Sequence, residues 1–288
     1  MQLKNQSFTH LVQLNLAMLL VSTSGVLGRY ISLSPPLTIL VRALLAVVVL
    51  WIYCILRGFS FHLEKRHRLP VIASGVLMGG HWVTYFYSLQ LSNVAIGMLS
   101  LFTYPIMTAF LEPLLLKTKF QWMHFVLGLL VMVGVFFLIP DFDFNNTYTM
   151  AILIGLFSAL LYALRNIIMK KRVAQYNGSS LMVWQLVIVA VGLSPFLFSM
   201  EVARIPEQLP WILVLALLTT AMGHTLFLVC FRYFSITSIS ILSCIQPIYG
   251  IILGTLFLKE FPSVMTMIGG ALILAAVAIE GFRSQPEP

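Results

Sequence analysis

Charged side chains are scarce in this sequence of 288 residues. Asp, Glu, Lys and Arg make up only 9% of it, whereas an average soluble domain contains about 25%. Apolar residues make up 60%, and the mean hydropathy is +0.98. A water-soluble fold of this length has too little interior to bury so many apolar side chains. The composition therefore excludes a soluble enzyme, a disordered tail and a nucleic-acid-binding module, and it indicates a protein that faces lipid.

Cysteine is also rare. Cys54, Cys230 and Cys244 all lie in apolar stretches, where three thiols form no disulfide framework and have no metal-ligand spacing. We therefore expect neither a metal nor a cofactor.

The apolar residues gather in ten runs, each close to the roughly 20 residues that a helix needs to cross a bilayer. The runs are 9–28, 35–57, 69–90, 94–116, 120–139, 148–170, 180–200, 210–231, 236–258 and 262–282. They leave only short connectors, and they do not alternate as the strands of a membrane barrel do. The predicted fold is an all-α integral membrane protein with ten transmembrane helices. The first run has no cleavage pattern and is interpreted as a retained span.

Basic residues divide unevenly between the two sets of connectors. Twelve Lys and Arg residues fall on one side, and only Arg29, Arg204 and Lys259 fall on the other. Because the basic side stays in the cytoplasm, we expect a protein of the inner or plasma membrane with both termini cytoplasmic. The basic run 64–68 is then a retention signal on the inner side, in preference to a site for lipid headgroups or nucleic acid.

Parts of the chain repeat at an offset of 142–143 residues. Pro105 corresponds to Pro247, Gly80-His81 to Gly223-His224, and Arg42 to Gln185. The offset predicts two five-helix repeats, 1–143 and 144–288. Since five is odd, the second repeat enters the membrane from the opposite side. Inverted repeats of this kind are typical of transporters that expose a midplane site to each side in turn.

Several stretches resemble the EamA-type branch of the drug/metabolite transporter superfamily. The stretches are SISILSCIQPIYGIILGTLFLKE ending at Glu260, the Gly-rich MIGGALILAAVAI, GLFSALLYALRNIIMKK, and the Arg42 region of the second span. After the fourth span the family often has a Glu, whereas this chain has Lys117-Thr118-Lys119. The resemblance implies an exporter of amino acids or other small metabolites, with relatives that move nucleotide sugars or phosphorylated sugars.

Polar residues inside the spans are the candidate binding residues, because an unpartnered polar group in hydrocarbon costs several kcal/mol. Arg42 could anchor an anionic or carboxylate-bearing substrate, or it could bind helix carbonyls or reach the outer headgroups. His81 and His224 could line one cavity, with proton transfer as a further role, or each could bind a neighbouring helix. The same structural alternative applies to Arg165, which lies near the inner end of its span and could reach the headgroups there.

Two prolines are predicted to kink their helices, because Pro105 and Pro247 each lack a backbone donor. The kinks could shape the substrate-binding cavity and act as hinges, or they could reflect helix packing alone. The remaining candidate substrate contacts are Trp82, Tyr85, Tyr104, Gln185, Gln246 and Tyr249.

No Asp lies inside a predicted span, and Glu112 and Glu280 lie close to span ends. Because coupling ions usually recruit a buried carboxylate, this favours facilitated export, exchange or His-mediated proton coupling over a carboxylate-driven pump. The sequence thus predicts a non-enzymatic exporter of zwitterionic or anionic metabolites, as a monomer or weak dimer in the lipid bilayer. A flippase for a lipid-linked substrate is the main alternative, and an intramembrane enzyme is a weaker one.

Overall fold

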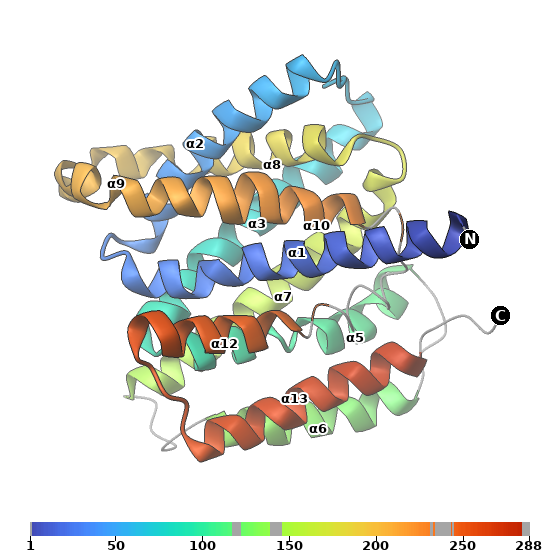
Figure 1. Ribbon diagram of the computed structural model, residues 1–288, viewed down its shortest axis with the longest axis vertical. Helices are drawn as coiled ribbons and strands as arrows, with labels where there is room; N and C mark the ends of the chain where they lie inside the picture. Colours follow the sequence, from blue (N-terminus) through green and yellow to red (C-terminus); the bar gives the residue numbers. More distant parts are fainter. Residues whose placement is uncertain are drawn as a thin grey trace.

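The computed structural model describes residues 2–116, 122–138, 146–230, 233, 243 and 245–283. The described residues are almost entirely helical and include no strand (Figure 1). In chain order the helices are α1 (Gln2–Tyr30), α2 (Pro35–Leu56), α3 (Lys65–Leu91), α4 (Val94–Leu101), α5 (Tyr104–Leu116), α6 (Trp122–Leu138), α7 (Thr147–Val173), α8 (Gly178–Leu193), η1 (Ser194–Phe198), η2 (Met200–Arg204), α9 (Ile205–Val214), η3 (Leu215–His224), α10 (Thr225–Cys230), α12 (Ile245–Leu258) and α13 (Val264–Arg283).

Local sequence signals account for several helix ends. Asn93, Asn146 and Asn177 precede α4, α7 and α8, and each side-chain oxygen accepts a hydrogen bond from a backbone N–H in the first turn. Such a cap satisfies a donor that the helix itself cannot pair. The prolines at the start of α2 occupy positions where a missing N–H costs nothing.

Within the described residues, six helical segments are long and apolar enough to cross a membrane, and some of them, such as Val94–Leu115 and Met200–Cys230, join consecutive helices. Three shorter apolar helices accompany them: Phe125–Leu138, Ile245–Leu258 and Val264–Ile279. Wherever the predicted spans fall on described residues, they are helical except at a few positions: Arg57, Phe102, Thr103, Ser199, Pro262 and Ser263. Large apolar side chains such as Leu56 and Phe257 are more than two-thirds exposed, at 80% and 71%. An all-helical protein with such an apolar exterior is consistent with a membrane protein.

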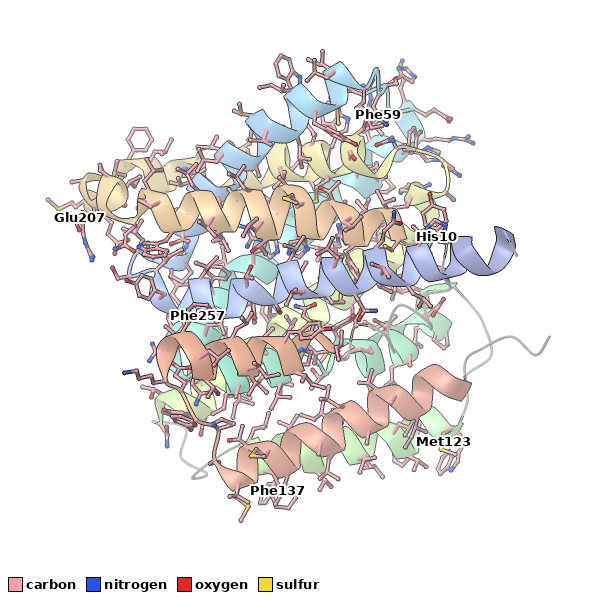
Figure 2. The ribbon with its side chains drawn as sticks, in the orientation of Figure 1. His10, Phe59, Met123, Phe137, Glu207 and Phe257 are labelled. Carbon is pink, nitrogen blue, oxygen red and sulfur yellow. The ribbon has the colours of Figure 1, made fainter. Side chains whose placement is uncertain are left out.

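The helices run alongside one another (Figure 1). In this view α2 and α8 form one edge, α6 and α13 the opposite edge, and α1, α3, α7 and α12 lie between them. The start of α1 and the end of α13 lie at the same end of the bundle, which we call the termini end. His10 and Met123 lie toward this end, whereas Glu207 and Phe257 lie toward the opposite one, which we call the Glu207 end (Figure 2).

Two predicted spans, 94–116 and 210–231, differ from a single regular helix. The span 94–116 is not one kinked helix but two helices, α4 and α5, with Phe102 and Thr103 between them. Pro105 has no N–H to donate to Leu101, and it takes the second position of α5, where none is needed. Its counterpart Pro247 lies at the third position of α12. The kink predicted at Pro247 would free the carbonyl of Ser243. The residues on either side of Ser243 lie outside the described residues.

The span 210–231 contains a second unpredicted feature. Between α9 and α10 the helix widens into the ten-residue π-helix η3. Its backbone hydrogen bonds join residues five apart rather than four, which rotates the side chains that follow relative to an α-helix. This rotation matters for the site, because η3 carries Thr220 and His224.

Glycines allow α6 and α13 to approach closely. A Cβ atom built on Gly269 would lie 2.5 Å from the carbonyl oxygen of Gly134. Small residues at helix interfaces provide the close packing that holds helices together in lipid. The α6–α13 pair therefore depends on these two positions.

Candidate functional site

A small polar cavity lies in the middle of the bundle. Its volume is about 20 Å³, which is enough for about one water molecule. Residues of α1, α2, α3, α4, α5, α7, η3 and α12, with Phe102 between α4 and α5, form its wall: Val21, Ser24, Arg42, His81, Trp82, Tyr85, Leu101, Phe102, Tyr104, Tyr162, His224 and Gln246. In this conformation the cavity is closed, and a larger molecule enters only if the helices separate.

Arg42 carries a positive charge at this cavity. Its side chain is fully buried, and its guanidinium carbon lies 4.1 Å from the centroid of the Trp82 ring. Its Nε donates a hydrogen bond to the hydroxyl of Thr220. One terminal nitrogen of Arg42 and the indole N–H of Trp82 have no hydrogen-bond partner among the described residues. The cavity therefore presents unused N–H donors, which suit an acceptor such as a carboxylate oxygen.

No acidic side chain balances this charge. The described lining of the cavity contains neither Asp nor Glu. The Trp82 face attracts the guanidinium through its ring quadrupole, but a cation–π contact does not neutralise the charge. The cavity is thus electrostatically suited to an anion.

His81 and His224 both line the cavity, as their matched positions in the sequence suggest. The Nδ1 of His81 lies 2.8 Å from the hydroxyl of Ser158, and this hydroxyl in turn donates to the carbonyl oxygen of His81 at 2.8 Å. Since the Ser158 proton is used in that bond, the network assigns a proton to Nδ1 and leaves Nε2 of His81 as an acceptor. The His224 ring lies 5.3 Å from Trp82.

Aromatic rings complete the wall. The rings of His81 and Tyr162 stack with centroids 4.4 Å apart, and Tyr104 meets Tyr162 edge to face at 4.8 Å. Tyr85 also lines the cavity, and Gln246 does so from α12. The predicted residues Arg42, His81, Trp82, Tyr85, Tyr104, His224 and Gln246 are therefore brought together in one place.

Two other predicted site residues lie elsewhere. Gln185 is fully buried but binds Arg165, with its Oε1 2.6 Å from a terminal nitrogen of that arginine. Tyr249 is half-buried and packs against the main apolar core. Neither residue belongs to the cavity wall. Arg165 does not reach the headgroups, because only 1% of it is exposed and two amide oxygens hold its guanidinium inside.

Sequence reasoning missed three polar residues of the site: Ser24, Ser158 and Thr220. Ser24 lines the cavity, while Ser158 and Thr220 bind His81 and Arg42. Hydroxyls are common in apolar helices, where they bond to their own backbone and give no distinctive pattern. The one available signal was that Thr219-Thr220 precedes His224 by about one turn.

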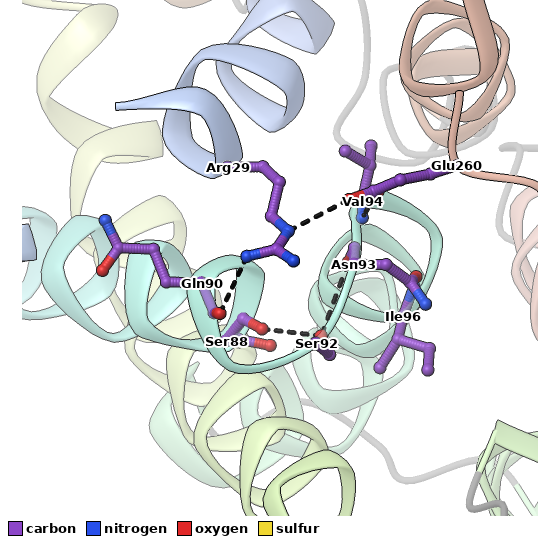
Figure 3. Close-up of polar contacts among 8 residues, drawn as sticks. All are labelled: Arg29, Ser88, Gln90, Ser92, Asn93, Val94, Ile96 and Glu260. Carbon is purple, nitrogen blue, oxygen red and sulfur yellow. Dashed lines mark hydrogen bonds and ion pairs between the residues drawn. The ribbon is translucent and has the colours of Figure 1, made fainter. Parts of the chain in front are cut away.

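A second polar cluster lies at the Glu207 end of the bundle (Figure 3). Glu260 accepts from Arg29 Nε at 3.0 Å and, through its other oxygen, from the backbone N–H of Val94 at 2.8 Å. Arg29 also donates to the carbonyl of Gln90 at 3.0 Å. The cluster joins α1, the α3–α4 turn and the loop that leads from α12 to α13.

A bundle of apolar helices with a buried polar cavity between them, as the described residues form, is the architecture of a polytopic membrane protein. The model of the EamA-like transporter family matches this chain twice, over residues 11–139 and 149–280. The chain belongs to this family, whose members are transporters and not enzymes.

Individual relatives agree with this assignment. The chain is 23% identical to the pseudopaline exporter CntI of Pseudomonas aeruginosa (strain UCBPP-PA14), over 80% of this chain and 81% of that protein. It is also 23% identical to the transporter YxxF of Bacillus subtilis (strain 168), over 97% of this chain and 92% of that protein. A crystal structure with 19% identity has a similar fold, with a TM-score of 0.70 over 94% of this chain and 96% of the other.

Proposed function

We propose that this protein exports small metabolites that carry a carboxylate, either anionic or zwitterionic and amino-acid-like, from the cytoplasm by alternating access. The observation that carries the proposal is the buried guanidinium of Arg42, which faces the cavity and which, among the described residues, has an unpaired nitrogen and no acidic partner. A buried charge without a counter-ion is costly, and a carboxylate substrate would supply the missing charge. The relative CntI is named as an exporter, which supports transport out of the cytoplasm.

The proposed architecture is a pair of five-helix repeats, 1–143 and 144–288, with ten transmembrane helices of inverted topology. Two observations support it. The family model matches each half separately. Packing is also paired: α3 packs along α7 as α1 packs along η3 and α10, and α3 meets α8 as α2 meets η3. Alternating access would then consist of one half rocking against the other.

The proposed orientation puts the termini end in the cytoplasm. Arg57 follows α2, Arg66 lies in the first turn of α3 and Lys170 lies in the last turn of α7, all at this end, whereas few basic residues lie at the Glu207 end. The excess of positive charge favours the cytoplasmic side. Arg42 then lies in the outer half of the bundle.

The test is release from proteoliposomes. The purified protein is reconstituted around a mixture of isotope-labelled amino acids and central carboxylic acids, and release is followed by mass spectrometry against protein-free vesicles. The proposal expects saturable release of carboxylate-bearing compounds, and runs with and without a pH gradient show whether protons take part. Release that matches the protein-free vesicles would overturn it.

One observation favours a second candidate, a flippase for a lipid-linked substrate. A groove of about 290 Å³ lies between α1, α9 and α12 and is lined by apolar residues such as Leu27, Trp211 and Phe257. Thr23, at its edge, is one residue from Ser24 of the cavity wall. A lipid-linked substrate could use the groove for its tail, and selective movement of labelled lipids with no release of soluble compounds would favour this candidate.

A further inference from the structure

A second arginine is buried in the bundle outside the cavity wall. Arg165 is 1% exposed, and its Nε has no hydrogen-bond partner among the described residues. Its terminal nitrogens donate to Asn166 Oδ1 at 2.9 Å and to Gln185 Oε1 at 2.6 Å. Both acceptors are neutral amides. Like Arg42, this guanidinium is hydrogen-bonded, but no carboxylate of the described residues neutralises it.

The surroundings of Arg165 hold it in place and leave its charge unbalanced. Gln185 is fixed in turn, because its amide nitrogen donates to Ser74 Oγ at 2.9 Å. Among the described residues, α7 forms an ion pair through Lys170, which binds Glu112, and Arg165 forms none. A fixed, buried and uncompensated cation is costly in a membrane protein.

Arg42 and Arg165 lie at similar distances from opposite ends of the bundle. Arg42 lies about two turns from the Glu207 end of α2, and Arg165 lies about two turns from the termini end of α7. The offset of 143 residues that relates Arg42 to Gln185 also relates Ser22 to Arg165. Each half thus carries one buried arginine in its first two helices, and inverted topology places the two toward opposite faces of the membrane.

Arg165 is also close to the cavity. Tyr162 belongs to the cavity wall, and Arg165 follows it by three residues on the same helix. Residues three apart lie on one face of a helix, so Arg165 is the next residue on that face toward the termini end. The Tyr162 ring, which stacks on His81, is thus the part of the cavity wall that precedes Arg165 along α7.

We propose that Arg165 is a second binding station for the substrate carboxylate, on the cytoplasmic side of the cavity, from which the carboxylate passes to Arg42. In the cytoplasm-facing conformation the anion meets Arg165 first, and movement of the halves transfers it past Tyr162. This inference rests on the proposed export of carboxylate compounds.

The variant Gln185→Glu tests the station without removing the arginine. Glutamate has nearly the shape of glutamine, and one oxygen of its carboxylate would lie where the amide oxygen now accepts from Arg165. The other oxygen replaces the amide nitrogen that donates to Ser74, so the Ser74 hydroxyl, which now donates to the carbonyl of Val71, would have to turn and donate to it. A permanent counter-ion neutralises the charge, so the protein unfolds at a temperature several degrees higher, because an uncompensated buried charge has gained a partner. Release of the labelled amino acids and carboxylic acids falls by about tenfold or more, because the station is occupied.

Gln208→Glu is the matched control. Gln208 accepts from the backbone of Ser32 at the Glu207 end, away from the cavity, and its replacement leaves release unchanged. A Gln185→Glu protein that melts higher and releases the mixture at the wild-type rate would show that Arg165 only braces α7 against α8. A Gln185→Glu protein that melts lower or fails to fold would overturn the view that Arg165 lacks a counter-ion.

The two proposals fail in different ways. If the wild-type protein releases no carboxylate compound, the proposed function is wrong and the station falls with it. If the wild type releases such a compound, Arg42→Gln abolishes the release and Gln185→Glu does not, only the station is wrong. A further readout is the half-saturation concentration on the cytoplasmic side, which Arg165→Lys raises if the guanidinium contacts the substrate.

Discussion

The guanidinium carbon of Arg42 lies over the ring of Trp82, 4.1 Å from its centroid. Both side chains line the same cavity, and each has an N–H without a hydrogen-bond partner among the described residues. The ring attracts the cation and limits its movement, while Thr220 fixes its Nε. The positive charge is therefore fixed at the wall of a cavity that has room for about one water molecule. Such an arrangement of the Arg42 charge favours the binding of an anion over the stability of the folded protein.

Replacement of Arg42 separates these two properties. We expect Arg42→Gln to reduce release of carboxylate compounds by about a hundredfold, and to leave the temperature of unfolding equal or higher, because a buried charge without a counter-ion is removed. Release assays and thermal unfolding of the same preparation check this. Arg57→Gln, at the exposed end of α2, should change neither quantity. Parallel loss of release and stability would instead indicate a structural arginine.

His81 should act in transport more than in folding. His81→Ala removes the hydrogen bond to Ser158 and the stacking on Tyr162, and we expect it to lower the free energy of unfolding by only about 1–2 kcal/mol. We expect release to fall by more than this loss explains. Ser158→Ala removes the hydrogen bond but keeps the ring, so it separates the two roles. If His81→Ala and Ser158→Ala reduce release equally, the ring itself does not contact substrate.

The ion pair at the Glu207 end should contribute modestly to stability. The side chains of Arg29 and Glu260 are 37% and 22% exposed, so water screens their attraction. We expect a coupling of about 0.5–1 kcal/mol in a double-mutant cycle of Arg29→Ala and Glu260→Ala, measured by denaturant unfolding. Glu260→Ala alone should cost more than Arg29→Ala, because it also leaves the N–H of Val94 without its acceptor. Equal single costs would contradict this account.

Close packing of α6 on α13 should be sensitive to one methyl group. In Gly269→Ala the new Cβ would meet the Gly134 carbonyl at 2.5 Å, a backbone atom that cannot rotate away. We expect a loss of about 1–3 kcal/mol in the free energy of unfolding. Gly192→Ala is the matched control, since nothing lies within 4 Å of its Cβ, and it should be neutral or slightly stabilising.

The topology can be checked independently of transport. A protein with two inverted halves of five helices has both ends on one side of the membrane. We expect tags fused to either end to be accessible only from the cytoplasm, as measured by protease protection in intact and opened cells. Tags on opposite sides would contradict the odd-repeat arrangement, and both tags outside would reverse the proposed direction of insertion.

Much of the fold could be predicted from local composition. A run of about 20 apolar residues has few stable arrangements in lipid other than a helix, and the described helices overlap the predicted apolar runs. The offset that relates His81 to His224 also pointed to a shared location, and both side chains line the cavity. The division of the span 94–116 could not be read from Pro105 alone, because a proline either bends a helix or starts a new one, depending on how the neighbouring helices pack.

The hydropathy of the chain and its basic residues were sufficient to predict a membrane protein, because both reflect whether each segment is more stable in lipid or in water. They could not tell that Gln185 would bind Arg165, or that Thr220 would bind Arg42. Such pairs depend on the rotation of each helix about its axis and, in the case of Thr220, on the ten-residue π-helix η3, which rotates its side chains relative to an α-helix. Contacts between distant helices set these rotations, so the site exists only in the packed bundle.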